Sequence, residues 1–223
     1  MTRLTLAAAA VAATIFAAEP RLTPVKLDCE RSETLALREA PQGASRPSTG
    51  RLIVHWRHGT ATFRDSGNVA GEIGGVEYEY CGYSPEVEMH LIRKSDDDLF
   101  TGVLLDSASG LILPAGKSVT FAPDHSRYFA RAQSDGVDGE DWYLYSRTGL
   151  RLWRGMSFVS AKNGKDGSDF VAATLEEPHW SATGELRATF TCSVDKKSTT
   201  VLTLTARSGV WAWQPKVDCS AKR

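Results

Sequence analysis

Acidic residues recur in two similar turn segments that could hold a cation. The run Asp135-Gly-Val-Asp-Gly-Glu-Asp-Trp142 returns later in the chain as Asn163-Gly-Lys-Asp-Gly-Ser-Asp-Phe170. Carboxylates and loop carbonyls are hard oxygen ligands, so Asp135, Asp138 and Asp141 are calcium candidates. The spacing does not match an EF-hand loop, and Asp-Gly is also a strong signal for a tight hairpin turn. We therefore expect solvated turns, with calcium binding as the alternative.

The usual catalytic motifs do not appear in the sequence. There is no Gly-x-Ser-x-Gly elbow, His-Glu-x-x-His helix, P-loop or Gly-x-Gly-x-x-Gly fingerprint. His55 and His58 are three residues apart, which on a strand sends them to opposite faces and argues against a shared metal. Neighbouring carboxylates such as Glu176 and Glu177 could serve a glycosidase, but any β protein has such residues. We predict a protein without catalytic residues and without a cofactor.

Six tryptophans are many for a chain of 223 residues. Trp142, Trp153, Trp211 and Trp213 lie in or beside predicted strands, and the last two share one face because they are two residues apart. Aromatic side chains either fill the space between sheets or form an exposed surface that binds protein or glycan. These four tryptophans are our candidate binding residues, with the two C-terminal ones first.

The first eighteen residues are typical of a secretory signal peptide. Arg3 supplies the positive charge, Leu4–Phe16 is apolar apart from two threonines, and Ala17-Ala18 ends the run. The run is shorter than the roughly 20 apolar residues of a transmembrane helix. We expect cleavage near Glu19 and a periplasmic or secreted mature protein without a membrane span. An uncleaved anchor or a buried N-terminal helix is the alternative.

Charge and cysteine content narrow the class of protein further. The formal net charge of −1 gives no basic excess that would point to nucleic acid. An even number of cysteines in an exported chain favours two disulfides, for which four cysteines allow three connectivities. We predict Cys29–Cys81 and Cys192–Cys219, because each pair then stays within one end of the domain; free buried thiols are the alternative. The sequence contains no Cys-x-x-Cys pair, so we expect neither a thiol redox centre nor a zinc ribbon.

Strands dominate the chain from Arg51 onward. Val76–Cys81 alternates apolar and acidic residues, the two-residue period of a half-buried strand. Before it, Glu30–Ala40 favours either a short helix or an irregular arm, and Pro41–Gly50 is rich in residues that break regular structure and predicts a loop. We therefore divide the mature chain into an N-terminal arm and loop, residues 19–50, and a single all-β domain, residues 51–223.

Three segments of this domain share a strand–turn–strand pattern. Leu105–Leu113 matches Leu144–Leu152, which in turn matches Leu204–Ala212. Each has a Ser/Thr-Gly turn, where glycine suits the positive φ that a tight hairpin demands. A second pair, Phe121–Tyr128 and Trp180–Arg187, precedes two of these segments.

The repeat spacing predicts the architecture. A period near 40 residues with about four strands per unit favours a propeller-like array of about 4–5 four-stranded antiparallel units. A longer spacing of about 60 residues between the last two copies places an insertion at Met156–Pro178. A β-sandwich is the alternative fold.

One region resembles a TolB-type WD40-like β-propeller repeat. The resemblance rests on Phe121-Ala-Pro-Asp124, Arg127-Tyr-Phe-Ala130, an Asp-Gly turn, Trp142-Tyr-Leu-Tyr145 and Gly149. His179-Trp-Ser-Ala-Thr-Gly184 is similar to a degenerate second copy. This chain has Pro-Asp-His where the family has Pro-Asp-Gly, and it has room for about five blades at most, fewer than a six-bladed TolB propeller. The resemblance implies an envelope protein that binds another protein and catalyses nothing.

Three functions fit these observations. The first is a non-enzymatic exported protein that binds another macromolecule, namely a protein. The second is an inhibitor or immunity protein against an exported hydrolase, and the third is a carbohydrate-binding module or glycan hydrolase. The small size, the export signal and the missing catalytic motif suit the first two equally. Recurring turns and aromatic strand ends on a rigid scaffold suit protein recognition, so we expect the first.

Overall fold

The computed structural model describes residues 23–40, 43–67, 75–97, 99–133, 139–162, 169–193 and 195–219. Within these ranges the chain consists of β-strands and turns, apart from one helix, α1 (Glu33–Glu39). The predicted signal peptide and the calcium candidates Asp135 and Asp138 lie outside the described residues.

The strands form four antiparallel sheets. The first sheet contains β2 (Ala44–Ser48), β3 (Arg51–Trp56) and β4 (Gly59–Arg64). The second contains β5 (Val76–Ser84), β6 (Met89–Asp96), β7 (Leu99–Asp106) and β8 (Ile112–Gly116). The third has the order β1 (Lys26–Asp28), β9 (Ser118–Phe121), β10 (Arg127–Ala132), β11 (Asp141–Ser146) and β12 (Arg151–Met156). The fourth contains β13 (Phe158–Lys162), β14 (Asp169–Trp180), β15 (Leu186–Cys192), β16 (Asp195–Arg207) and β17 (Val210–Gln214).

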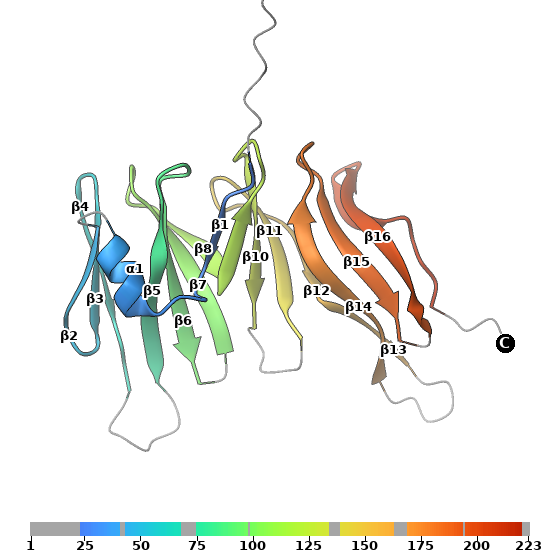
Figure 1. Cartoon of the computed structure of the whole chain (residues 1–223), viewed down its shortest axis with the longest axis horizontal. Coiled ribbons are helices and arrows are strands. Elements are labelled where there is room, and N and C mark those ends of the chain that lie inside the picture. Colours follow the sequence, from blue (N-terminus) through green and yellow to red (C-terminus); the bar gives the residue numbers. More distant parts are fainter. Residues whose placement is uncertain are drawn as a thin grey trace, which may run out of the picture.

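The sheets stand side by side in an open row, with the first and the last at opposite ends of the molecule (Figure 1). Only Lys117 separates β8 from β9, and only Ser157 separates β12 from β13, so the chain passes directly from one sheet to the next. The all-β class and the presence of several antiparallel sheets are confirmed. The predicted four strands per unit hold for the second sheet, whereas the first, third and fourth described sheets have three, five and five strands. A propeller is not confirmed, because the row is open in this view, and a sandwich of two sheets does not describe four.

Apolar side chains fill the space between each pair of neighbouring sheets. Leu52 and Tyr80 pack between the first and second sheets, Leu104 and Phe121 between the second and third, and the third and fourth enclose a further cluster that includes Leu204. Strands of the two middle sheets therefore bury both faces. Each fully buried side chain of this kind contributes about 1.5–3 kcal/mol, which gives the row its stability.

The predicted hairpin turns are present. Gly110, Gly149 and Gly209 adopt φ values of 75°, 84° and 80° in the β7–β8, β11–β12 and β16–β17 turns. Gly184 has φ 76° in the β14–β15 turn, and His125, at the matching position of the β9–β10 turn, has φ 55°. The repeats thus share backbone conformation, and the insertion predicted at 156–178 supplies β13 and most of β14.

The N-terminal segment differs from the prediction. The prediction of a loop at residues 41–50 was wrong in part, because this segment contains the strand β2. The pairing of β2 with β3 is irregular and shifts register between Ser45 and Ser48. The short helix α1 lies within Glu30–Ala40, the segment for which the sequence favoured either a short helix or an irregular arm. The described part of residues 19–50 also supplies β1, which pairs with β9 of the third sheet.

Both predicted disulfides are confirmed. Cys29 is bonded to Cys81 with 4.7 Å between their Cα atoms, and Cys192 to Cys219 with 5.5 Å. Two disulfides are consistent with an oxidising compartment. Across the described residues, no helix has the length and apolar character needed to cross a membrane.

Candidate functional site

The four candidate tryptophans lie between the third and fourth sheets. Trp142 is buried in the core between the two sheets, so its side chain does not form part of an exposed surface. Its ring centroid lies 6.2 Å from that of Trp213, which lies 5.7 Å from that of Trp153. Trp211 is also half-buried, and the guanidinium of Arg127 lies 5.7 Å from its ring centroid. The cluster fills the space between two sheets; binding at its half-buried members stays a prediction.

The acidic turns offer no cation site among the residues that can be placed. Asp141, the third calcium candidate, is buried rather than solvated, and its Oδ1 accepts a hydrogen bond from Arg154 Nη2 at 3.0 Å. In the described ranges, no group of three or more His, Cys, Asp or Glu side chains could hold a metal ion.

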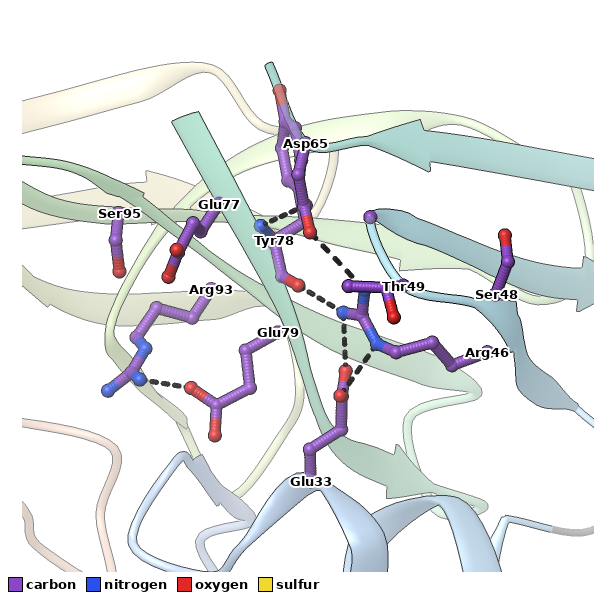
Figure 2. A pocket seen from close by; sticks show the side chains of 11 residues that line it. Glu33, Arg46, Ser48, Thr49, Asp65, Glu77, Tyr78, Glu79, Arg93 and Ser95 are labelled. Atoms are coloured by element: carbon purple, nitrogen blue, oxygen red, sulfur yellow. Dashed lines mark hydrogen bonds and ion pairs between the residues drawn. The ribbon is translucent and has the colours of Figure 1, made fainter. Parts of the chain in front are cut away.

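A charged pocket lies where the first sheet, the second sheet and α1 meet (Figure 2). Its volume is about 550 Å³. Two arginines and four carboxylates line it, together with hydroxyl groups and backbone: Glu33, Arg46, Ser48, Thr49, Gly50, Asp65, Glu77, Tyr78, Glu79, Arg93 and Ser95. The pocket sits on β5, which is an edge strand of the second sheet.

Charged side chains cover the free edge of β5. Asp65 Oδ1 accepts the N–H of Tyr78 at 2.9 Å, and Glu33 Oε1 accepts the N–H of Tyr80 at 2.8 Å. Arg46 Nη2 donates to the carbonyl oxygen of Tyr78. An open edge strand is a template for pairing with another chain, and side chains that satisfy its backbone remove that hazard. These three residues therefore have a structural role.

Arg46 joins the carboxylates that cover the edge. Its Nε and Nη2 donate to the two oxygens of Glu33 at 2.7 and 2.8 Å, and its Nη1 to Asp65 Oδ2 at 3.4 Å. The hydrogen bonds to Glu33 raise the pKa of Arg46 further above its usual value. We call the Arg46 guanidinium with its bonds to Glu33 and Asp65 the fork. The fork holds α1, β2 and the residue after β4 against β5.

The other wall of the pocket belongs to β5 and β6. Glu77 and Glu79 are two residues apart on β5, so they share one face; they pair across the sheet with Ser95 and Arg93 of β6. Arg93 Nη2 forms an ion pair with Glu79 (Figure 2). Burial raises the pKa of Glu79, and the charge of Arg93 only partly opposes that shift. The Nε of Arg93 is buried and has no partner among the described residues.

The side chains that line this pocket carry more negative than positive charge. Its four carboxylates exceed its two guanidinium groups, which leaves a net charge of −2 when all are ionised. Glu77 is exposed and, within the described residues, has no hydrogen bond or ion pair. A second hollow of about 300 Å³ shares Asp65 and Glu77 with the pocket and brings no cation. The arrangement attracts a cationic group.

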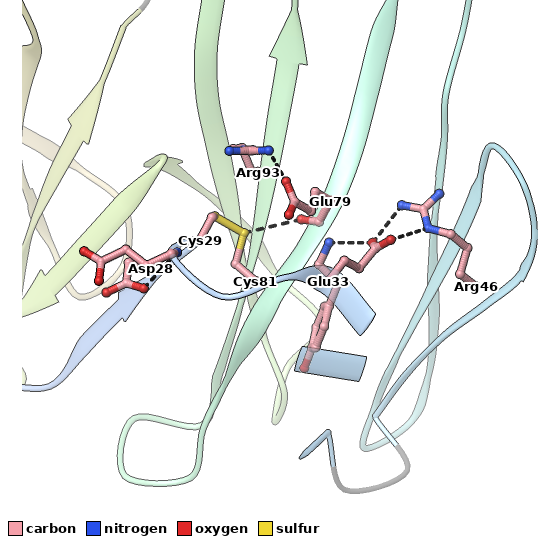
Figure 3. The surroundings of a disulfide bond; sticks show 9 residues. Asp28, Cys29, Glu33, Arg46, Glu79, Cys81 and Arg93 are labelled. Carbon is pink, nitrogen blue, oxygen red and sulfur yellow. Dashed lines mark hydrogen bonds and ion pairs between the residues drawn. A yellow bond between two sulfur atoms is a disulfide. The ribbon is translucent and has the colours of Figure 1, made fainter. Parts of the chain in front are cut away.

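The Cys29–Cys81 disulfide lies close to Glu33 and Glu79, which line the pocket (Figure 3). Cys81 lies on β5 two residues after Glu79, and Cys29 precedes the helix that carries Glu33. The covalent bond therefore ties the start of α1 to the strand whose edge Glu33 covers.

Sequence reasoning missed most of this pocket. Arg46 lay in a predicted loop, and nothing local connects it with Glu33 or Asp65. One signal was present, because the alternation of Val76–Cys81 already places Glu77 and Glu79 on one face of a strand. Such a pair of carboxylates, aimed away from the apolar face, could have been named as a candidate.

No family model matches the chain, and no curated protein or solved structure is detectably similar to it. The resemblance to TolB-type repeats therefore rests on the sequence motifs alone.

Proposed function

We propose that this protein is exported to the periplasm or secreted, and that it works without catalysis by binding another protein at the charged pocket. The observation that carries the proposal is the excess of carboxylates over guanidinium groups around an open hollow. A lysine or arginine side chain of the partner would enter it, with Glu77 and Glu79 as its recognition residues.

The state of the pocket residues supports binding over catalysis. Glu33, Arg46 and Asp65 form hydrogen bonds with the backbone of β5. They therefore hold in place the wall of the pocket that β5 forms. Catalysis would need several groups that converge on a reacting atom, whereas a rigid wall with the exposed carboxylate of Glu77 on it suits recognition.

The row of sheets itself supports a common origin with TolB-type repeats. The three matched turns share their positive-φ glycines, and a repeated hairpin unit that stacks on its neighbours is the building principle of propellers. We propose that the chain is an open array of such units, which presents the pocket at its N-terminal end.

Affinity capture from an envelope extract tests the proposed function. Wild-type protein should retain a partner that Glu77→Gln/Glu79→Gln loses at least tenfold, because the substitution removes both recognition charges and keeps the size of the side chains. Glu86→Gln/Glu176→Gln is the matched control, since it removes two exposed charges elsewhere. The retained partner should also dissociate as salt is raised. A partner that both variants hold equally, or a substrate turned over with a single essential carboxylate, would contradict the proposal.

A further inference from the structure

The strand β17 presents a free edge on the fourth sheet, which stands at one end of the row (Figure 1). Among the described strands, β17 pairs with β16 alone. After β17 the chain runs to Cys219, which is bonded to Cys192 of β15. Because β15 lies on the other side of β16, this segment leads away from the free edge. Across the described residues, no hydrogen bond from outside the sheet reaches the backbone of Trp211 or Trp213.

Features that protect other edge strands of this molecule are missing from β17. An open edge is a template for pairing with another strand, and proline, charged side chains or irregular pairing usually prevent this. Pro47 lies in β2 and Pro114 in β8, and the pairings of β12 and β13 with their neighbours shift register. The run Val210-Trp-Ala-Trp-Gln214 has no charge and no proline, and it pairs with β16 without a register shift. This edge can therefore accept another strand.

The turn before β17 determines which backbone groups point outward. Turn residues 208–209 have φ values of 50° and 80° and join Arg207 to Val210, which are paired. In such a two-residue hairpin the flanking residues exchange both backbone hydrogen bonds, and bonded pairs then alternate along the ladder. The N–H and C=O groups of Trp211 and Trp213 therefore point away from β16, toward the free edge.

Tryptophan rings hold this edge in place. Trp211 and Trp213 lie on one face of β17 and pack against the core between the third and fourth sheets. The ring centroid of Trp213 lies 5.7 Å from that of Trp153. Both residues of β17 are half-buried, so part of each stays accessible at the edge. A strand that is fixed in this way loses little conformational freedom when it binds.

We propose that β17 pairs with β17 of a second copy of this chain, antiparallel and about a two-fold axis through Ala212. Since Trp-Ala-Trp reads the same in both directions, Trp211 of each copy then lies opposite Trp213 of the other. Opposite residues in an antiparallel ladder can exchange both of their backbone hydrogen bonds, which this register gives to the outward groups of both tryptophans. Aromatic residues opposite one another stabilise such a pair of strands, and the uncharged strands meet without like-charge repulsion.

The paired strands would join two copies through the same surface of each, the usual arrangement of a symmetric dimer. The charged pocket lies where the first and second sheets meet, whereas β17 belongs to the fourth sheet. The inference therefore does not depend on the proposed function of the pocket.

Cysteine cross-linking tests the pairing and its register. Ala212 would lie opposite Ala212 of the second copy at a position without hydrogen bonds, where Cα atoms are about 4.5 Å apart, a distance that a disulfide spans. Mild oxidation of Ala212→Cys, with the native disulfides intact, should give a covalent dimer, and peptide mapping should find the two introduced cysteines bonded to each other. Val201→Cys is the matched control, because Val201 lies on neighbouring β16 and is 57% exposed. It should stay monomeric.

Analytical ultracentrifugation measures the association itself. The wild type should show a concentration-dependent equilibrium between monomer and dimer. Ala212→Lys should raise the dimer Kd by roughly tenfold or more, because it places two ammonium groups opposite each other, whereas Val201→Lys should keep the Kd of the wild type. If Ala212→Lys fails to fold, the cross-linking result decides. A wild type that stays monomeric at its highest soluble concentration, a dimer that Ala212→Lys leaves intact, or equal cross-linking of both cysteine variants would overturn the inference.

Discussion

His90 is a buried titratable residue in the core of the second sheet. Its Nδ1 lies 2.9 Å from the hydroxyl of Tyr80, and the ring of Tyr83 packs on it with centroids 4.5 Å apart. Burial lowers the pKa of His90 to about 4 and raises that of Tyr80. Both side chains are therefore neutral at neutral pH, as a buried hydrogen-bonded pair requires.

Stability should fall in acid because of His90. In the unfolded chain the pKa of histidine is about 6.5, so between about pH 6.5 and 4 the unfolded state binds more protons than the folded state. The free energy of unfolding then decreases as pH falls, by about 3 kcal/mol over this window for a shift of this size. His90→Gln does not titrate and keeps a polar partner for Tyr80. Urea unfolding from pH 7 to 4 should show a shallower decline for the variant, and parallel declines would contradict the assignment.

Turn residues show what a sequence can predict at this scale. The repeat pattern indicated glycine at positive φ for Gly110, Gly149 and Gly209 because that requirement is local. The same alignment places His125 opposite Gly184, and both have positive φ. By contrast, the partners of Arg46 come from α1, the end of β4 and β5, and no spacing in the sequence connects them.

At the scale of elements, Arg46 holds the first sheet and α1 against the second sheet. Its side chain is 21% exposed and that of Glu33 22%. Arg46→Met would leave Glu33 and Asp65 without their cation and the carbonyl of Tyr78 without this donor. We expect a loss of roughly 2 kcal/mol in the free energy of unfolding, below the value for a fully buried pair because water reaches these groups.

Two further substitutions sharpen that measurement. Arg46→Lys keeps the charge and loses the two-pronged geometry, so its stability should fall between wild type and Arg46→Met. Arg51→Met removes an exposed arginine of neighbouring β3 and should change stability by less than about 0.5 kcal/mol. Chemical unfolding of all three gives the comparison, and an Arg46→Met protein as stable as Arg51→Met would show that the fork is dispensable.

Strands with a local pattern were predictable, and strands that depend on a partner were not. Val76–Cys81 alternates in sequence and lies in β5. The strand β2 contains Pro47 and three polar neighbours, and it exists because it pairs with β3 on one side. Proline is compatible with such an edge strand, but the sequence alone indicated a break. The short α1 likewise depends on the packing of Ala36 against the core between the first and second sheets.

At the scale of the whole molecule, antiparallel sheets formed from hairpins that follow one another in the sequence were predictable, whereas the number of strands in each sheet and the closure of the array were not. Turn spacing indicated antiparallel units of about four strands. Whether such units close into a ring depends on the angle between neighbouring sheets. Lys117 is the single residue between the second and third sheets, and Ser157 the single residue between the third and fourth. Neither position carries a local sequence signal for that angle, so a ring and an open row are indistinguishable from the pattern of strands.

The two disulfides constrain different parts of this row. The Cys29–Cys81 bond closes a loop with a sequence separation of 52, which contains α1 and the whole first sheet. The Cys192–Cys219 bond has a separation of 27 and encloses β16 and β17. In the chain-entropy model these bonds contribute about 4 and about 3.5 kcal/mol. The two disulfides therefore stabilise the protein by similar free energies, and they differ in which end of the row each one constrains.

Removal of each bond should therefore loosen one end of the molecule. In Cys29→Ala/Cys81→Ala, hydrogen exchange should rise in residues 30–66 and leave the fourth sheet protected, because the core between the third and fourth sheets is intact. Cys192→Ala/Cys219→Ala should raise exchange in residues 199–219 instead. The first variant should also lose partner binding, since Glu33 and the edge of β5 are no longer held together, while the second retains it. Exchange that rises evenly along the chain in both variants would show that the row unfolds as one unit and that neither bond acts on a single end.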